Sequence, residues 1–338
     1  MLTPAAGAAL PFSPAAMPVS SPVSARRTLD DRDVGRFDRA RLRRARHSTP
    51  HPTATDAAFM TTTQAPSGTP GTTDTTDAGS SPYRFVRVER DGATITITLA
   101  RPEKRNALSM EVMTELRDAI REAGRTDALA VVLAAEGKVF SAGHNFGDMA
   151  GADLATTRAL FVLCTEMMDA IQQIPQPVVA KVHALATAAG CQLIASCDLA
   201  IAARSAGFAL PGGKGGLFCT TPLVAVSRNI SRKRALELAL TGDPIDAETA
   251  ADWGLINAAV PDDELDSAVD DLVARVTRGS AYGRSMGKQA FYAQIGLDQR
   301  QAYDIAIESM AAGALTADAQ EGFAAFLEKR HPEFTSKP

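Results

Sequence analysis

Short apolar segments alternate with helical ones through the middle of the chain, and this alternation constrains the fold more than any other feature. The segments at residues 130–133, 177–182 and 199–202 are apolar runs of strand length. Between them, apolar residues recur at helical spacing around residues 160–171 and again in a small-residue stretch from Ala188. Strand–helix–strand units place their strands in one sheet with helices packed against it. The sequence therefore predicts an α/β fold.

The two ends of this region differ from its middle. Residues 85–89 and 94–99 alternate between apolar and polar side chains on either side of an Asp-Gly turn, which predicts a hairpin. A helix is expected to begin at Ser109, whose hydroxyl can cap its first turn. From Arg232 onward only helical spacing remains, so we expect the last third of the chain to be helical.

The first 80 residues are rich in Pro, Ala, Thr and Ser and show no lasting pattern, so we expect them to be disordered. Six arginines between Arg36 and Arg46 favour a transit peptide and hence the mitochondrial matrix, although aspartates at positions 30, 31, 33 and 38 oppose it. Equally open is that Met60 is the natural start. A bacterial origin would place the protein in the cytoplasm.

Composition narrows the class of partner. A net charge of -4 gives no field that would attract nucleic acid or an anionic membrane, so an anionic ligand must meet a local basic group. No apolar run approaches the ~20 residues of a membrane-spanning helix. The four cysteines have neither CxxC spacing nor a paired histidine, so we expect no bound metal; they are Cys164, Cys191, Cys197 and Cys219.

Two glycine-bearing loops follow two of the predicted strands. The loop at residues 140–145 contains a glycine that lets the backbone turn sharply. The loop at residues 186–192 opens a helix whose positive dipole end faces the same edge of the sheet. Two backbone N–H groups held in this way suit a thioester carbonyl oxygen that gains negative charge, because each such donor contributes ~3–4 kcal/mol. The loops therefore predict a site for thioester chemistry.

Three motifs occur in a fixed order, and they occupy residues 101–108, 140–145 and 190–198. In this order and spacing the chain resembles the crotonase (enoyl-CoA hydratase/isomerase) family from about Tyr83 onward. Within that family it is similar to the enoyl-CoA hydratase domain-containing protein 3 group. The residues behind the finer resemblance are Ser141, His144, Gly216, Leu217, Phe218, Cys219 and the segment at 288–292.

This resemblance implies a fold and an assembly. The expected fold is the ClpP/crotonase-like spiral of β-β-α units, with an acyl-coenzyme A cleft in a core at residues 81–275. A C-terminal helical subdomain at residues 276–338 is implied to join subunits into a homotrimer or homohexamer. The implied substrate is an acyl-coenzyme A thioester. Coenzyme A would then enter as part of the substrate, and no separate cofactor is expected.

The resemblance also assigns the site residue by residue. It places the two oxyanion donors at the backbone N–H groups of His144 and Ala189. It places four residues near coenzyme A, namely Arg105, Asn145, Phe326 and Lys329. The last two are implied to contact the ligand of a neighbouring subunit. The cationic side chains of Arg105 and Lys329 can form charge-assisted hydrogen bonds with the phosphate groups of coenzyme A.

The chain departs from the family where hydratases place two catalytic glutamates, because Gln192 and Gly212 occupy these positions. Neither an amide nor a glycine can exchange a proton with water or substrate near neutral pH. General acids and bases each typically raise a reaction rate by ~100- to 10,000-fold, so the rate of hydration should be strongly reduced. Restoring both acids, Gln192→Glu with Gly212→Glu, is expected to raise hydration.

Replacement groups for the missing acids cannot be selected by spacing, and the candidates are His144, Asp148, Asp153 and Lys214. For His144 we expect only the backbone N–H to act. Asp198 is expected to be structural, and Cys219 lacks a base that would make it a nucleophile. Three hypotheses stay open: an acyl-coenzyme A lyase or isomerase, a binding protein without turnover, and a structural oligomer that binds no coenzyme A.

Overall fold

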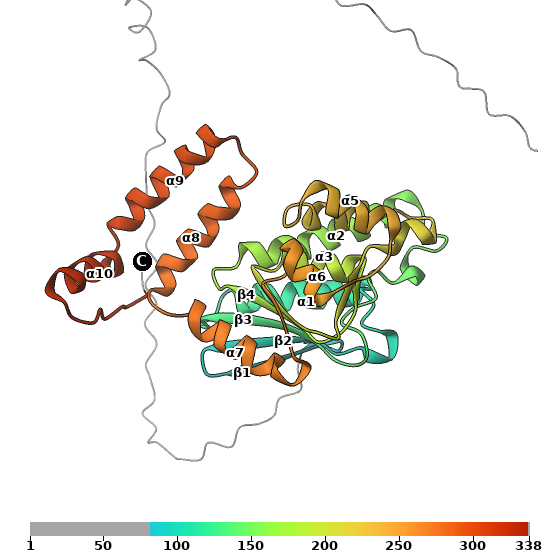
Figure 1. Cartoon of the computed structure of the whole chain (residues 1–338), viewed down its shortest axis with the longest axis horizontal. Helices are drawn as coiled ribbons and strands as arrows, with labels where there is room; N and C mark the ends of the chain where they lie inside the picture. The colour runs from blue at the N-terminus through green and yellow to red at the C-terminus, as the bar shows by residue number, and fades with distance from the viewer. Residues whose placement is uncertain (1–81, 337–338) are drawn as a thin grey trace, which may run out of the picture. The chain divides into compact units, whose positions relative to one another are not determined.

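The computed structural model describes residues 82–336 (Figure 1). The chain divides into a unit at residues 1–74 and a second at 75–338, which contains every described residue. The predictions made for the first 80 residues lie outside the described residues. Within residues 82–336, no helix has both the length and the apolar character that crossing a membrane requires.

A six-stranded sheet forms the centre of the second unit, in the order β1-β2-β3-β4-β6-β9. The predicted hairpin is confirmed, because β1 and β2 pair antiparallel, and each later neighbour along the sheet pairs parallel. Figure 1 shows β1 to β4 side by side. The strands are β1 (Val86–Asp91), β2 (Thr94–Leu99), β3 (Ala130–Ala135), β4 (Val178–Val182), β6 (Leu199–Ala203) and β9 (Ala258–Val260).

Helices cover both faces of this sheet. On one face, Val131 and Leu133 of β3 join the main core with α1 (Met110–Ala123) and α2 (Leu154–Gln173). On the other face, the alternate residues Ala130 and Val132 pack with α7 (Leu265–Val276) in a second cluster. Burial on both faces explains why the parallel strands read as continuous apolar runs. The helix expected to begin at Ser109 is α1, and Ser109 Oγ accepts a bond from Val112 N.

A second, three-stranded sheet lies beside the site, in the order β5-β7-β8. It consists of β5 (Ala186–Thr187), β7 (Gly207–Ala209) and β8 (Ile245–Asp246). The prediction that only helices follow Arg232 was wrong, because β8 and β9 lie there between α5 (Arg232–Thr241), α6 (Ala247–Trp253) and α7. Strands of two and three residues are too short to show alternation.

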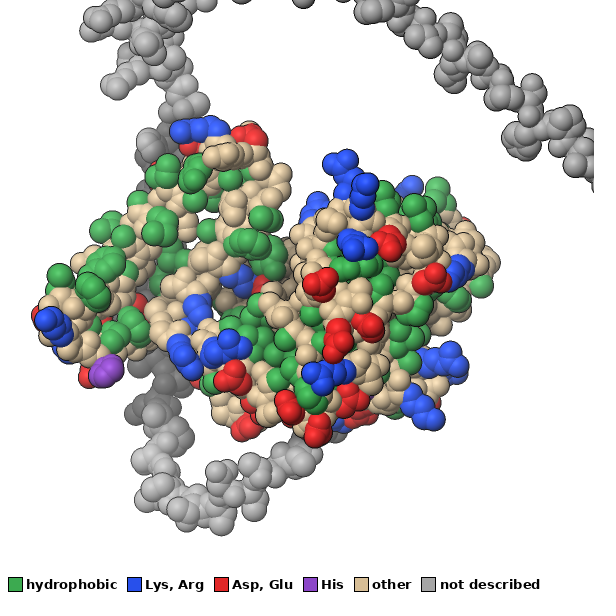
Figure 2. All heavy atoms as spheres, viewed as in Figure 1, with side chains coloured by type: hydrophobic (Ala, Val, Ile, Leu, Met, Phe, Trp, Pro, Cys, Tyr) green, Lys and Arg blue, Asp and Glu red, His purple; other side chains and the backbone are tan. Residues whose placement is uncertain are grey.

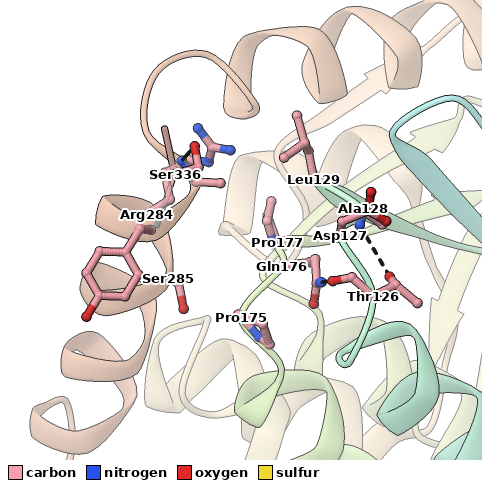
Figure 3. A pocket seen from close by; sticks show the side chains of 12 residues that line it. Thr126, Asp127, Ala128, Leu129, Pro175, Gln176, Pro177, Arg284, Ser285 and Ser336 are labelled. Carbon is pink, nitrogen blue, oxygen red and sulfur yellow. Dashed lines mark hydrogen bonds between the residues drawn. The ribbon is translucent and has the colours of Figure 1, made fainter. Parts of the chain in front are cut away.

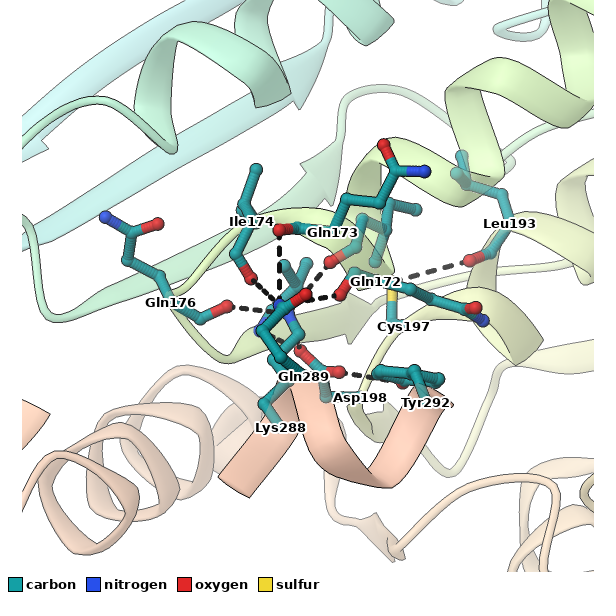
Figure 4. Close-up of polar contacts among 12 residues, drawn as sticks. Gln172, Gln173, Ile174, Gln176, Leu193, Cys197, Asp198, Lys288, Gln289 and Tyr292 are labelled. Carbon is teal, nitrogen blue, oxygen red and sulfur yellow. Dashed lines mark hydrogen bonds and ion pairs between the residues drawn. The ribbon is translucent and has the colours of Figure 1, made fainter. Parts of the chain in front are cut away.

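The C-terminal helices are α8 (Ala281–Gln294), α9 (Gln299–Ala314) and α10 (Ala317–Glu328). A polar latch fixes α8 to the core, and it consists of Asp198, Lys288 and Tyr292 (Figure 4). Lys288 Nζ donates to Asp198 Oδ2 at 2.7 Å and to two carbonyl oxygens at the end of α2 and before β4. Asp198 also accepts from the backbone N–H of Val178. The structural role predicted for Asp198 is confirmed.

Candidate functional site

The first bend of the site is held by a short parallel bridge to Leu108. Leu108 N donates to Gly143 O at 2.8 Å, and Asn145 N donates to Leu108 O at 3.1 Å. The residue between these two partners, His144, therefore turns its own N–H and C=O away from Leu108. Gly143 has φ +83, a conformation that only glycine adopts without strain.

The second bend is strained at Ala188, which has φ +49 and ψ -117. It joins β5 to α3 (Ala189–Ser196), and its N–H donates to Ala209 O at 2.9 Å. Ala189 is the first residue of α3, so its N–H has no acceptor within the helix. Strain of this kind persists only where the surroundings enforce it, and it is often found at functional sites.

The two bends touch each other through their glycines. A Cβ on Gly143 would lie 3.2 Å from Ala189 N, and a Cβ on Gly190 would lie 2.7 Å from Ser141 O. Among the described residues, neither the N–H of His144 nor that of Ala189 has a hydrogen-bond partner. The fold thus brings two unpaired backbone N–H groups into one neighbourhood.

A cavity of about 590 Å³ opens between the same bends and the turn that follows β7. Its walls are mostly apolar and include Met149, Phe161 and Phe218. Among the described residues, no Asp, Glu, Lys or Arg lines it. The volume is in the range of small-molecule sites. The cavity can bind an apolar group beside the two donors, but it offers no carboxylate.

His144 is the one imidazole in the lining, and its surroundings keep it neutral. Burial lowers the pKa of His144 to about 4, and the charge of Asp148 offsets only part of this effect. The ring meets Phe161 edge to face at 5.3 Å between centroids. Its Nε2 is enclosed and has no hydrogen-bond partner in the described part of the chain. A group with this pKa is a poor base at neutral pH.

Gly212 has a structural reason to be glycine. A Cβ at this position would lie 2.2 Å from Leu217 O and 2.7 Å from Cys219 Sγ. The turn closes on Gly212, whose N–H donates to Cys219 Sγ at 3.2 Å. A glutamate at this position would require the turn to move, because its Cβ would meet the backbone of Leu217. Sequence reasoning missed this contact, since no pattern marks the approach of Leu217.

Gln192 and Cys219 are both buried near the bends. Gln192 lies in the first turn of α3, and its Oε1 is enclosed without a partner among the described residues. Burial raises the pKa of the Cys219 thiol even though it accepts a bond from Gly212 N. The thiol therefore stays protonated at neutral pH, which agrees with the expectation that it is no nucleophile.

Three of the four candidates for the missing acids are engaged elsewhere. Asp148 accepts bonds from Met110 N and from the Asn145 amide, each at 2.9 Å. Asp153 caps α2 by accepting from Thr156 N at 2.8 Å. Lys214 forms an exposed ion pair with an aspartate on the neighbouring loop. Of the four, only His144 lines the cavity.

The residues assigned to coenzyme A are not brought together in one chain. Arg105 is exposed, and its carbonyl accepts from the cavity-lining Ala142 at 3.0 Å, so it lies beside the first bend. The Asn145 side chain is used to cap the turn at Phe146–Asp148. Phe326 and Lys329 lie on and after α10 and do not line the cavity. Their role on a neighbouring subunit stays a prediction.

No group of three or more His, Cys, Asp and Glu side chains within residues 82–336 is arranged to hold a metal ion.

A second cavity of about 250 Å³ lies between α8 and the turns before β3 and β4 (Figure 3). Arg284 and Ser285 of α8 line it from one side, and Gln176 from the other. None of the residues predicted for the site lies there.

The fold and the paired bends define a class of protein with known members. The chain belongs to the enoyl-CoA hydratase/isomerase family, whose sequence profile matches residues 89–337. It is 40% identical over 265 residues to mouse "Enoyl-CoA hydratase domain-containing protein 3, mitochondrial". The aligned region covers 78% of this chain and 88% of the relative.

Two solved structures are also similar. The crystal structure of an enoyl-CoA hydratase from Mycobacterium smegmatis matches with a TM-score of 0.72 and 43% identity, covering 74% of this chain and 98% of that chain. The crystal structure of human enoyl Coenzyme A hydratase domain-containing protein 3 matches with a TM-score of 0.71 and 38% identity, covering 74% of this chain and 100% of that chain. The predicted crotonase fold and the resemblance to this group are confirmed.

Proposed function

We propose that the protein binds an acyl-coenzyme A thioester whose carbonyl oxygen accepts hydrogen bonds from the N–H groups of His144 and Ala189. The supporting observation is the contact between Gly143 and Ala189, which sets two unpaired donors beside one apolar cavity. Paired backbone donors stabilise negative charge on a thioester oxygen without needing any side chain. Arg105, whose backbone lies beside the first bend, would supply the cation that meets the phosphates of coenzyme A.

The same site lacks the groups that add water to a double bond. A general base must accept a proton near the working pH, and a pKa of about 4 leaves His144 a poor one. The Gln192 amide cannot act as a base at all. We therefore favour binding and polarisation of the thioester, with hydration close to the uncatalysed rate. This is the alternative of an acyl-coenzyme A-binding protein without hydratase turnover.

Calorimetry and a turnover assay on the full chain test this proposal. Butyryl-CoA is expected to bind with measurable heat, whereas crotonyl-CoA and longer enoyl-CoAs are expected to be hydrated at the buffer rate. Absence of acyl-CoA binding would overturn the proposal and favour the structural oligomer. Rapid hydration at any chain length would instead restore the enzyme hypothesis and require a proton-transfer group outside the cavity lining.

Two locations remain as proposals. The mouse relative is named as mitochondrial, and one solved relative comes from a mycobacterium. If the segment before Tyr83 is a transit peptide, the mature protein is in the mitochondrial matrix, and if not, a bacterial protein stays in the cytoplasm. The intact mass of native protein tests these cases, because a mature chain that begins neither at Met1 nor at Met60 would indicate removal of a transit peptide.

A further inference from the structure

His144 contributes more than its backbone to the cavity. It carries the only side-chain nitrogen among the cavity-lining residues that the structure describes. Because its backbone N–H is one of the two proposed carbonyl donors, its ring lies within one side-chain length of the bound thioester oxygen. A polar atom on the first few carbons of the acyl group would therefore fall within reach of the imidazole.

The two ring nitrogens are in different surroundings. Nε2 is enclosed and has no partner among the described residues, while the ring packs edge-on against Phe161. Nδ1 is not among the enclosed, unpartnered atoms, and no hydrogen bond engages it in residues 82–336. A neutral imidazole carries one proton, and its position follows the partners that each nitrogen can find. We assign the proton to Nδ1, which can then donate a hydrogen bond to an acceptor in the cavity.

We infer that the imidazole of His144 selects acyl thioesters that carry an oxygen near the thioester carbonyl, such as a 3-hydroxyacyl or a 3-oxoacyl group. This inference rests on the proposed function. An unsubstituted acyl chain would leave the Nδ1 proton unpaired in an apolar wall, which is unfavourable. An acyl oxygen removes that cost, so discrimination of about 10-fold to 100-fold is expected.

Calorimetry on the full chain with three thioesters tests the inference. We expect 3-hydroxybutyryl-CoA and acetoacetyl-CoA to bind at least about tenfold more tightly than butyryl-CoA. In His144→Phe, which keeps a ring against Phe161, the ratio of the dissociation constants should fall to about one. In the matched variant His183→Phe, which removes an imidazole that does not line the cavity, the ratio should persist.

The outcomes separate this inference from the function on which it rests. If the wild-type protein binds none of the three thioesters, the proposed function fails. If it binds all three equally, or if His144→Phe keeps the ratio, the function stands and the selection by His144 is refuted. Should His144→Phe not fold, nitrogen-15 chemical shifts of the wild-type histidines still decide. A ring proton on Nε2 in the 3-hydroxybutyryl-CoA complex would overturn the assignment.

Discussion

At the scale of single residues, the site depends on positions where a Cβ has no room. Gly143 and Gly190 each face backbone or side-chain atoms of the opposite bend at 2.7–3.2 Å from the place of a Cβ. Real Cβ atoms need more space than this. The two donors can therefore approach one another only because these side chains are absent, and this requirement can be tested directly.

Gly143→Ala is expected to weaken the binding of butyryl-CoA about fivefold, because the added methyl group would push the bends apart and lose a hydrogen bond of about 1 kcal/mol. Gly151→Ala is the matched control, since Gly151 also has positive φ but no atom lies within 4 Å of its Cβ position. Calorimetry on both variants provides the measurement. Equal losses in the two would point to backbone strain rather than to the donors.

Gln192→Glu alone is expected to raise the hydration of crotonyl-CoA at least about tenfold, since it adds a proton-transfer group at the position where the family resemblance implies a catalytic glutamate. Gly212→Glu is expected to lower the midpoint of thermal unfolding, because its Cβ would meet Leu217 O. Crotonyl-CoA turnover and thermal melts check the two effects. An unchanged rate in Gln192→Glu would mean that the amide position does not face the substrate.

The residue-scale predictions from sequence differ in quality for a physical reason. The glycine turn and the helix start could be predicted because they are local features that leave a pattern in the chain, and the family resemblance then assigned the donors to His144 and Ala189. The closure of Leu217 on Gly212 could not be predicted, because it depends on the path of a turn in three dimensions. The same limit hid the fact that Asp148 and Lys214 are already engaged.

At the scale of elements, the latch decides how α8 is attached to the core. The Lys288–Asp198 pair is nearly enclosed, with side chains 10% and 14% exposed, and three acceptors surround Lys288 Nζ. Tyr292 OH donates to the second oxygen of Asp198 at 2.7 Å. Figure 4 shows these side chains of α8 directed at the loops that precede β4 and β6.

Lys288→Met is expected to reduce the free energy of unfolding by about 3–5 kcal/mol, because it leaves the buried Asp198 carboxylate without its cation. The control is Lys181→Met, which breaks a Lys–Asp pair of similar length whose side chains are 31% and 81% exposed. That change should cost less than about 1 kcal/mol. Urea unfolding of both variants gives the comparison. Similar losses would show that burial of the latch does not matter.

Elements were predicted well where they are long. The hairpin and α1 were predicted from their periodicity, and the buried strands β3, β4 and β6 were predicted as apolar runs of strand length. The strands β8 and β9 were not, since short strands gain their stability from the neighbours they pair with, here β7 and β6. Their existence is a property of the assembled sheets.

At the scale of the whole molecule, the C-terminal helices leave many apolar side chains uncovered. Figure 2 shows such side chains along α9 and α10, and the most exposed are Met310, Leu315, Phe326 and Leu327 at 75–83%. Patches of this kind mark interaction surfaces. They favour association through these helices, while the number of three or six copies and the contact of Phe326 and Lys329 with a neighbouring subunit's ligand rest on the family resemblance alone.

Light scattering on the purified protein is expected to give the mass of three or six chains. The double change Leu315→Glu with Phe326→Glu should shift the mass toward a single chain, because charge would be placed in an apolar contact. Leu240→Glu, an exposed leucine on α5, is the control and should keep the assembly. A monomeric wild-type protein would contradict the proposal.

The bridge between Leu108 and His144 has one more consequence. Because both donors belong to the main chain, no substitution other than proline removes either N–H outright. A substitution can replace an acidic side chain, change the polarity of the cavity wall or remove the imidazole, and a ligand oxygen could still accept hydrogen bonds from both N–H groups. A scaffold of this kind can therefore lose the ability to add water and keep the ability to bind its ligand at every step.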